Sequence, residues 1–223
     1  MALPLRAILF DLDGTLLDTA PEMVGALNAL RVEQGLAPLA FEEVRPSVSH
    51  GSTRLIQVGF PDADPQRFAA LQSRFLQLYA AGVGLRTSLF SGMESVLAEL
   101  ASRGLSLGVV TNKPAWLTDP LLAQLDLRDR FACVVSGDTV SERKPHPLPM
   151  LHAAKLAGVS AEACIYVGDA ERDVQAAHAA GMPALVATYG YLRADEDWQA
   201  WGGDGAVAWP ADLISWLDRS GRA

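Results

Sequence analysis

The sequence predicts an α/β fold in which a doubly wound parallel sheet, a Rossmann-like core, carries a small helical cap inserted after its first strand. Short apolar segments of strand length alternate with amphipathic helix patterns between residues 91 and 187. Such alternation is typical of a parallel sheet with helices on both faces. Residues 21–81 instead show helical periodicity without a strand pattern. The predicted division is residues 1–18 and 86–223 for the core and 19–85 for the cap.

The first strand is expected at residues 5–10, an almost unbroken apolar run of the kind found in buried parallel strands. Asp11 and Asp13 follow it, and Gly14 then ends the strand. Side chains two residues apart on an extended segment point to the same side. The two acids should therefore face one volume, where their repulsion would raise their pKa values or recruit a hard cation such as Mg²⁺.

Apolar residues recur at helical spacing near both ends of the cap, and a small polar turn at residues 48–54 separates its helices. After the cap, Ser91 and Glu94 form a capping-box pattern before a helix over residues 93–100. Further strands are expected at residues 105–110, 131–135, 163–167 and 184–187, and helices at 115–125, 147–157 and 171–180. The tail should add a weak strand near residues 206–207 and a closing helix, with its tryptophans covering the core.

The composition limits the classes of partner that the protein can bind. The formal net charge is −8 and no cluster of five basic residues occurs, so a nucleic-acid partner is disfavoured. No apolar run reaches the length needed to cross a bilayer, and the first residues lack a signal-peptide layout. We therefore expect a cytoplasmic protein without a membrane partner, acting as a monomer or weak homodimer.

Polar residues follow the predicted strands in four segments: Asp11 with Asp13, residues 111–113, residues 143–145, and Gly168-Asp169 with Asp173. Each alone has an ordinary explanation, such as a helix cap, a solvated loop or an acidic first helix turn. Because the C-terminal ends of parallel strands meet at one edge, the four segments together predict one ligand site there.

With these segments the sequence resembles, over nearly its whole length, the haloacid dehalogenase-like (HAD) superfamily of phosphohydrolases. The matching motifs are Asp11-Leu12-Asp13-Gly14-Thr15, Thr111, Lys144-Pro145-His146-Pro147, and Gly168-Asp169 with Asp173. His146 stands where relatives often carry an acidic residue. Within the superfamily the sequence is most similar to phosphoglycolate phosphatases, and residues 110–114, 189–191 and 201–204 also resemble N-acetylmuramic acid 6-phosphate phosphatases.

The resemblance implies a magnesium-dependent phosphomonoesterase that hydrolyses a small phosphorylated metabolite. Asp11 would attack phosphorus and form an aspartyl-phosphate, and Asp13 would protonate the leaving alcohol and then activate water. Asp11, Asp169 and the backbone carbonyl of Asp13 would bind Mg²⁺, with Asp173 acting through water or by orienting its neighbours. Lys144 would neutralise Asp11 and the phosphoryl oxygens.

Thr111 would cradle the phosphate together with backbone N–H groups at the strand-to-helix turns. Arg54 is the cation of the polar cap turn, and an insert that begins just after Thr15 must lie over the catalytic strand ends. It is therefore a candidate for pairing with a substrate carboxylate. The remaining residues expected to bind substrate are Thr15, Asn112, Lys113, His50 and Gly51.

Three other activities fit part of the pattern. A sugar-phosphate mutase would use the same core residues. A dehalogenase needs no metal and so has no use for Asp13 and Asp169 together. A phosphoacceptor signalling module would lack both the helical insert and the second carboxylate two residues after the nucleophile.

Overall fold

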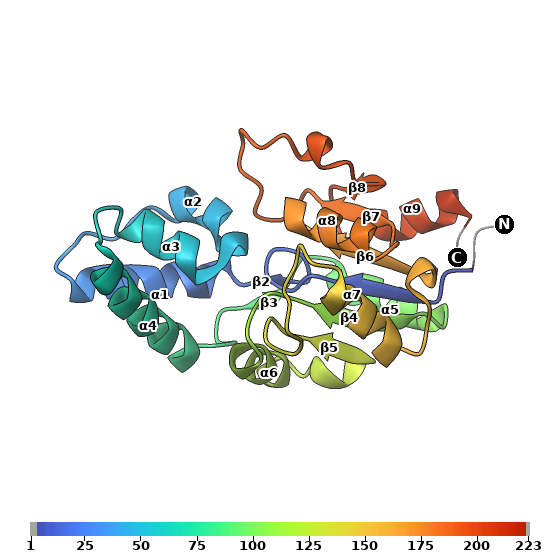
Figure 1. The fold of residues 1–223 in the computed structure, drawn as a ribbon, viewed down its shortest axis with the longest axis horizontal. Helices are drawn as coiled ribbons and strands as arrows, with labels where there is room; N and C mark the ends of the chain where they lie inside the picture. The colour runs from blue at the N-terminus through green and yellow to red at the C-terminus, as the bar shows by residue number, and fades with distance from the viewer. Residues whose placement is uncertain (1–3, 222–223) are drawn as a thin grey trace.

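Six parallel strands form the central sheet of the computed structural model, which describes residues 4–221 (Figure 1). β1 (Ala7–Phe10) lies at its centre, between β4 (Ser106–Val110) and β6 (Cys164–Gly168). Outside β4 lies β5 (Cys133–Val135), and outside β6 lie β7 (Ala184–Ala187) and β8 (Gly205–Val207). The strand order runs outward in both directions from β1, which puts the switch point at its C-terminal end. The predicted doubly wound α/β fold is confirmed.

Helices cover both faces of the sheet because its strands are apolar on both sides. In β1, Ile8 and Phe10 pack into one cluster, and Ala7 and Leu9 pack into the other, as the two-residue period of a strand requires. The first face is covered by α5 (Met93–Ser102), α6 (Ala115–Gln124) and α9 (Asp212–Ser220). The second is covered by α7 (Leu148–Leu156) and α8 (Glu171–Ala179). Short 3₁₀ turns, η2 (Arg128–Arg130) and η3 (Ala161–Ala163), precede β5 and β6.

The cap is built from helices, as the periodicity predicts. It contains α1 (Ala20–Glu33), α2 (Phe41–Val44), the 3₁₀ turn η1 (Arg45–His50), α3 (Gly51–Gly59) and α4 (Pro65–Ala81). Figure 1 shows this group to one side of the sheet. Its helices enclose an apolar cluster around Leu27, Leu55 and Phe75, which Leu117 and Tyr191 join from the core. The domain boundaries at residues 18 and 86 stay a prediction.

Two very short strands, which the sequence does not predict, lie where the chain enters and leaves the cap. β2 (Leu17–Asp18) pairs antiparallel with β3 (Ser88–Leu89). The buried carboxylate of Glu22 accepts hydrogen bonds from the backbone N–H groups of Gly84 and Arg86 and from the Thr87 hydroxyl, at 3.0, 2.8 and 2.5 Å. These bonds fix the returning chain beside α1.

The predicted capping box of Ser91 and Glu94 is wrong. Helix α5 begins at Met93 after Gly92, which has a φ of 85° and supplies no side-chain cap. Glu94 instead forms an ion pair with Arg130 at 2.5 Å. A left-handed residue directly before the helix removes the geometry in which a preceding serine could bond to the first turn.

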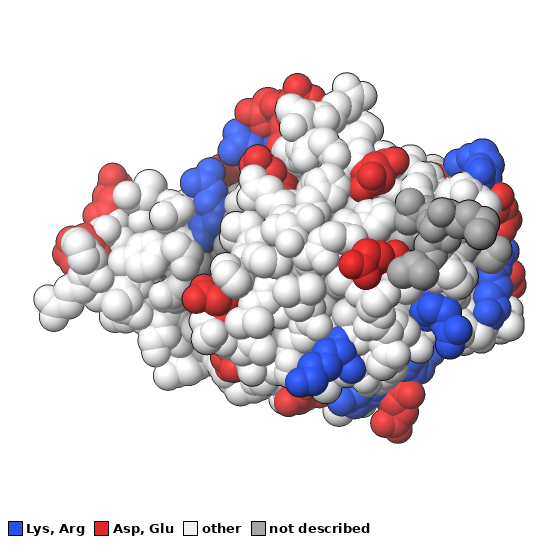
Figure 2. All heavy atoms as spheres, turned by 45° about the vertical axis from the view of Figure 1, so that its right-hand side comes forward, with Lys and Arg blue, Asp and Glu red and all other residues white. Residues whose placement is uncertain are grey.

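In the tail, β8 and α9 confirm the predicted strand and closing helix, and a 3₁₀ turn, η4 (Trp198–Trp201), precedes them. Trp198, Trp201 and Trp216 pack against the core clusters, whereas Trp209 is 68% exposed. Within residues 4–221 no helix has the length and apolarity to cross a membrane. Figure 2 shows a face on which acidic and basic side chains are interspersed and form no extended basic patch.

Candidate active site

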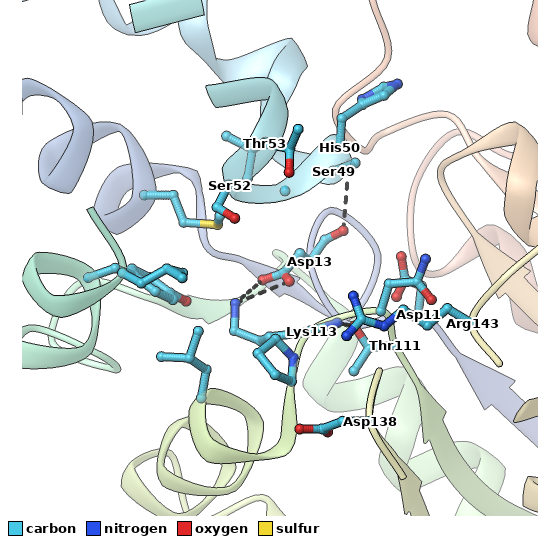
Figure 3. Close-up of a pocket in the computed structure, with 18 of the residues that line it drawn as sticks. Asp11, Asp13, Ser49, His50, Ser52, Thr53, Thr111, Lys113, Asp138 and Arg143 are labelled. Carbon is cyan, nitrogen blue, oxygen red and sulfur yellow. Dashed lines mark hydrogen bonds and ion pairs between the residues drawn. The ribbon is translucent and has the colours of Figure 1, made fainter. Parts of the chain in front are cut away.

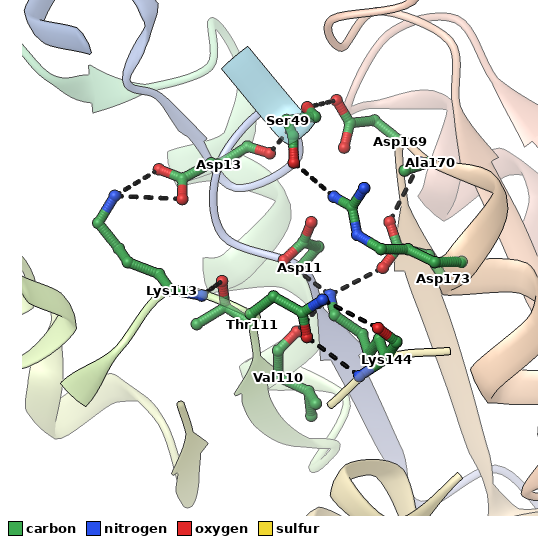
Figure 4. Close-up of polar contacts among 12 residues, drawn as sticks. Asp11, Asp13, Ser49, Val110, Thr111, Lys113, Lys144, Asp169, Ala170 and Asp173 are labelled. Carbon is green, nitrogen blue, oxygen red and sulfur yellow. Dashed lines mark hydrogen bonds and ion pairs between the residues drawn. The ribbon is translucent and has the colours of Figure 1, made fainter. Parts of the chain in front are cut away.

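Three buried carboxylates converge at the C-terminal edge of the sheet (Figure 4). Asp11 follows β1, Asp169 follows β6, and Asp173 lies in the first turn of α8. One oxygen from each lies within 4.8 Å of the others. The backbone N–H of Asp11 donates to the carbonyl of Val167 at 2.9 Å. The sheet ladder therefore continues past β1 and holds Asp11 beside the end of β6.

Lys144 lies beneath this cluster with a fully buried side chain. Its Nζ atom forms ion pairs with Asp11 Oδ1 at 2.9 Å and with Asp173 Oδ1 at 2.7 Å. It also donates to the Val110 carbonyl at 2.9 Å and to the Tyr166 hydroxyl at 2.7 Å. One buried ammonium surrounded by four oxygens is well satisfied, but it offsets only part of the repulsion among three acids.

The environment of Asp169 fits a divalent cation. Its Oδ2 accepts hydrogen bonds from Ser49 Oγ at 2.5 Å and from the backbone N–H of Tyr191 at 2.9 Å. Its Oδ1 is buried without a hydrogen-bond partner among the described residues. Burial, together with the charges of Asp11 and Asp173, raises the pKa of Asp169 to about 7. A hard, oxygen-binding ion would both complete this carboxylate and offset the repulsion.

Gly14 allows the turn after β1 to pass close to this cluster. Its φ is 87°, and a Cβ atom there would overlap Asp169 Oδ2. The turn places the backbone carbonyl of Asp13, another predicted metal ligand, 3.4 Å from Ser49 Oγ. Since the same hydroxyl donates to Asp169, the carbonyl lies at the edge of the carboxylate cluster.

The side chain of Asp13 is engaged elsewhere (Figure 3). Lys113 Nζ donates to both of its carboxylate oxygens, at 3.0 and 3.1 Å, and lies 4.5 Å from the ring centroid of Tyr79 in the cap. Burial opposes the charge on Lys113, but Asp13 and Tyr79 outweigh it and hold the pKa of Lys113 above its ordinary value. Lys113 thus links the core acid to the cap.

Thr111 and Asn112 support the lysines. The backbone N–H of Thr111 extends the ladder of β4 by donating to the Val135 carbonyl at 2.9 Å, and Thr111 Oγ1 accepts from the backbone N–H of Lys113 at 3.2 Å. The Asn112 amide donates to the Lys144 carbonyl and accepts from its backbone N–H, both at 3.0 Å. Asn112 therefore fixes the loop that carries Lys144.

A cavity of about 660 Å³ separates these core residues from the cap (Figure 3). Its walls include most of the predicted site residues: Asp11, Asp13, His50, Gly51, Thr111, Asn112 and Lys113. Partial burial, with the charge of nearby Arg172, lowers the pKa of His50. The lining also includes apolar and aromatic residues: Met23, Val48, Leu76, Tyr79, Trp116 and Leu117.

Two predicted substrate contacts do not reach this cavity. Thr15 is fully buried below the turn, and its carbonyl accepts a hydrogen bond from the Tyr189 hydroxyl at 2.9 Å. Arg54 is absent from the lining, to which α3 contributes only residues 51–53. The lining therefore supports a substrate contact for neither residue.

Several further polar residues at the site are absent from the sequence-based set, including three that lie beside predicted residues in the sequence. Ser49 enters from the cap turn, Arg172 lies between two acids of the last motif, and Arg143 precedes Lys144. All three line the cavity. The polar cap turn contains Ser49 and the last motif contains Arg172, so the sequence places both residues near the site. Neither pattern indicates which side chains point into the cavity.

The fold and this charged crevice define a class of protein, namely α/β proteins with a helical cap over a carboxylate cluster at the edge of a parallel sheet. The chain belongs to the haloacid dehalogenase-like hydrolase family, whose sequence signature matches residues 8–187.

Its relatives include a phosphoglycolate phosphatase from Xanthomonas campestris, which is 47% identical over 208 residues, or 93% of this chain and 94% of that protein. An N-acetylmuramic acid 6-phosphate phosphatase from Pseudomonas putida is 35% identical over 215 residues, or 96% of each. A crystal structure described as a predicted phosphoglycolate phosphatase from Haemophilus somnus has a TM-score of 0.84 at 25% identity and covers 96% of this chain and 98% of its own. The predicted family and enzyme class, a phosphoric monoester hydrolase, are confirmed.

Proposed function

We propose that the protein is a magnesium-dependent phosphomonoesterase that acts through an aspartyl-phosphate on Asp11. The observation that carries this proposal is the ion pair of 2.9 Å between Lys144 Nζ and Asp11 Oδ1 at the wall of the cavity. A phosphate ester resists an anionic nucleophile because both are negatively charged. The buried ammonium reduces that repulsion where attack would occur.

Asp11 and Asp13 would divide the reaction between them. An Asp11 oxygen forms a bond to phosphorus as the ester bond breaks, and the Asp13 carboxyl gives its proton to the departing alcohol. Water then cleaves the aspartyl-phosphate and gives a proton back to Asp13. Lys113, which contacts both Asp13 oxygens, holds this carboxylate on the cavity wall. Thr111, which also lines the cavity, would support the phosphoryl group.

Asp11, Asp169 and the Asp13 carbonyl would hold Mg²⁺, with Asp173 acting through water or by orienting its neighbours. The unpartnered Asp169 Oδ1 supports this assignment. When bound, Mg²⁺ would supply positive charge to the phosphoryl oxygens. The cytoplasmic location, the monomer or weak homodimer, and a small-molecule phosphate ester as the only partner belong to the same proposal.

Phosphoglycolate is the first candidate substrate, because the relative that shares 47% identity is a phosphoglycolate phosphatase. N-acetylmuramic acid 6-phosphate is the second, because the cavity of about 660 Å³ is larger than a two-carbon acid needs. The cap already contacts the core in this structure, through Ser49 and Lys113, so this volume is not that of a detached cap. A sugar-phosphate mutase would use the same core.

The test is phosphate release from a panel that contains both candidates and p-nitrophenyl phosphate, with Mg²⁺ or with excess EDTA. We expect turnover with Mg²⁺, loss in EDTA and restoration when Mg²⁺ is returned. Full activity in EDTA would contradict the metal assignment. Conservation of ester phosphate during turnover of a sugar phosphate would indicate a mutase instead.

A further inference from the structure

The side chain of Arg172 lies at the site but has no role in the proposed reaction. It lies in the first turn of α8, between Asp169 and Asp173, and lines the cavity. One guanidinium nitrogen, Nη2, donates to the backbone carbonyl of Ser49 in the cap at 2.6 Å. Ser49 itself lies at the acidic cluster, where its hydroxyl donates to Asp169 (Figure 4).

The guanidinium has unused hydrogen-bonding capacity. Its Nε is buried and has no hydrogen-bond partner among the described residues. Within residues 4–221, the ion pairs of the carboxylate cluster are made by Lys144, and Arg172 makes none. A permanently charged group with an unpaired, buried N–H is costly unless something binds to it.

The charges around Arg172 indicate what binds. When ionised, the three clustered carboxylates exceed Lys144 and Arg172 by one negative charge, and the Asp13–Lys113 pair cancels itself. A bound dication would turn this excess into one net positive charge. The site would then attract a dianion, and Arg172 would present a planar donor group beside the nucleophile.

We propose that Arg172 contacts the phosphoryl oxygens of the substrate, an assignment that rests on the proposed phosphatase function. Its hydrogen bond to the Ser49 carbonyl uses one donor and holds the side chain at the cavity wall, with further donors left over for a ligand. The cap therefore helps to hold a core arginine at the site. This contact involves the part that all phosphate esters share, so it should act on every substrate alike.

Arg172→Ala tests this assignment, with Arg45→Ala as the matched control. Arg45 also donates from a guanidinium nitrogen across the cap–core boundary, to the Gly190 carbonyl at 3.2 Å, but it does not line the cavity. Calorimetry would measure the Kd of inorganic phosphate for each Mg²⁺-saturated protein and the Kd of Mg²⁺ itself. Turnover of p-nitrophenyl phosphate and of an alkyl phosphate would be measured in parallel.

Arg172→Ala should weaken phosphate binding about ten- to hundredfold, the range of a lost charge-assisted hydrogen bond, and reduce kcat/KM similarly on both esters. Arg45→Ala should stay within about twofold of the original protein. Mg²⁺ should bind Arg172→Ala as tightly or more tightly, because a neighbouring positive charge is gone. Arg172→Lys keeps the charge, so its phosphate affinity and kcat/KM should lie between those of Arg172→Ala and those of the original protein. It serves as the test variant if Arg172→Ala does not fold.

Unchanged phosphate affinity with tighter Mg²⁺ binding would overturn the proposal and make Arg172 a counter-charge only. Equal losses in Arg172→Ala and Arg45→Ala would overturn it in favour of a cap-docking role. If the original protein itself neither binds phosphate nor hydrolyses either ester, the proposed function fails. Turnover by the original protein with no effect of Arg172→Ala contradicts this inference alone.

Discussion

The sheet edge and the cap reach the same cavity by different physical routes. At the sheet edge, the ladder hydrogen bonds of Asp11 and Thr111 continue the strands and place both residues without help from side chains. From the cap, Ser49 reaches the carboxylate cluster through tertiary contacts alone, to Asp169 and the Asp13 carbonyl and from Arg172. The first route depends on local backbone geometry, and the second depends on how two domains pack.

This difference indicates what the core and the cap each contribute to the site. The core carries the charges that the chemistry needs, buried in contact with one another. The cap contributes a hydroxyl and a carbonyl from Ser49, which orient Asp169 and Arg172, and apolar and aromatic lining residues such as Tyr79. Substitutions should therefore have their largest effects at the strand ends, and smaller effects as they move into the cap.

Asp11→Asn should have the largest effect. The amide cannot form the acyl-phosphate bond, and loss of a nucleophile can cost on the order of 10⁶-fold in kcat. Quenched-flow labelling with a radioactive phosphate ester should detect a covalent phosphoprotein in the original chain and none in the variant. A variant with near-normal turnover would assign the nucleophile to another residue and remove the contrast between core and cap.

Asp13→Asn should cost less, about 10²- to 10⁴-fold, because it removes proton transfer and leaves the nucleophile in place. The loss should shrink on p-nitrophenyl phosphate, whose leaving group needs little protonation, and remain large on an alkyl phosphate. Comparing kcat for the two esters tests this role. Equal losses on both would argue that Asp13 acts mainly through its ion pair with Lys113.

Ser49→Ala should have an intermediate effect, because it removes a hydrogen bond of 2.5 Å to the proposed metal ligand Asp169 while that carboxylate itself remains. Loss of such a supporting contact typically lowers metal affinity about 10- to 100-fold. Ser52→Ala is the matched control, since Ser52 also lines the cavity but accepts from the Gln72 amide at 3.0 Å. The Mg²⁺ Kd from calorimetry should rise for Ser49→Ala only, and a parallel rise for Ser52→Ala would indicate a general disturbance of the cap.

The same difference explains which features could be predicted from the sequence. An apolar strand followed by acids fixes where Asp11 and Asp169 lie, because parallel strands end at one edge. Strands β2 and β3 are too short to show the alternation of apolar and polar residues by which a strand is predicted. The start of α5 depends on the left-handed backbone of Gly92. Periodicity also cannot show that Arg172 lines the cavity, because the position of its side chain depends on a carbonyl from the cap.

Arg54 gives the smallest expected effect and the sharpest test of this view. Arg54 is the cation of the polar cap turn, so the sequence makes it a candidate for binding the substrate carboxylate. In the structure, however, the part of α3 that lines the cavity ends at residue 53. Because Arg54 does not line the cavity, Arg54→Ala should change kcat/KM by about twofold or less. The measurement compares phosphoglycolate, which carries a carboxylate, with p-nitrophenyl phosphate, which does not. A tenfold loss confined to phosphoglycolate would restore the carboxylate-binding role and show that the cap turn rearranges when substrate binds, whereas equal tenfold losses would indicate that Arg54 supports the fold of the cap.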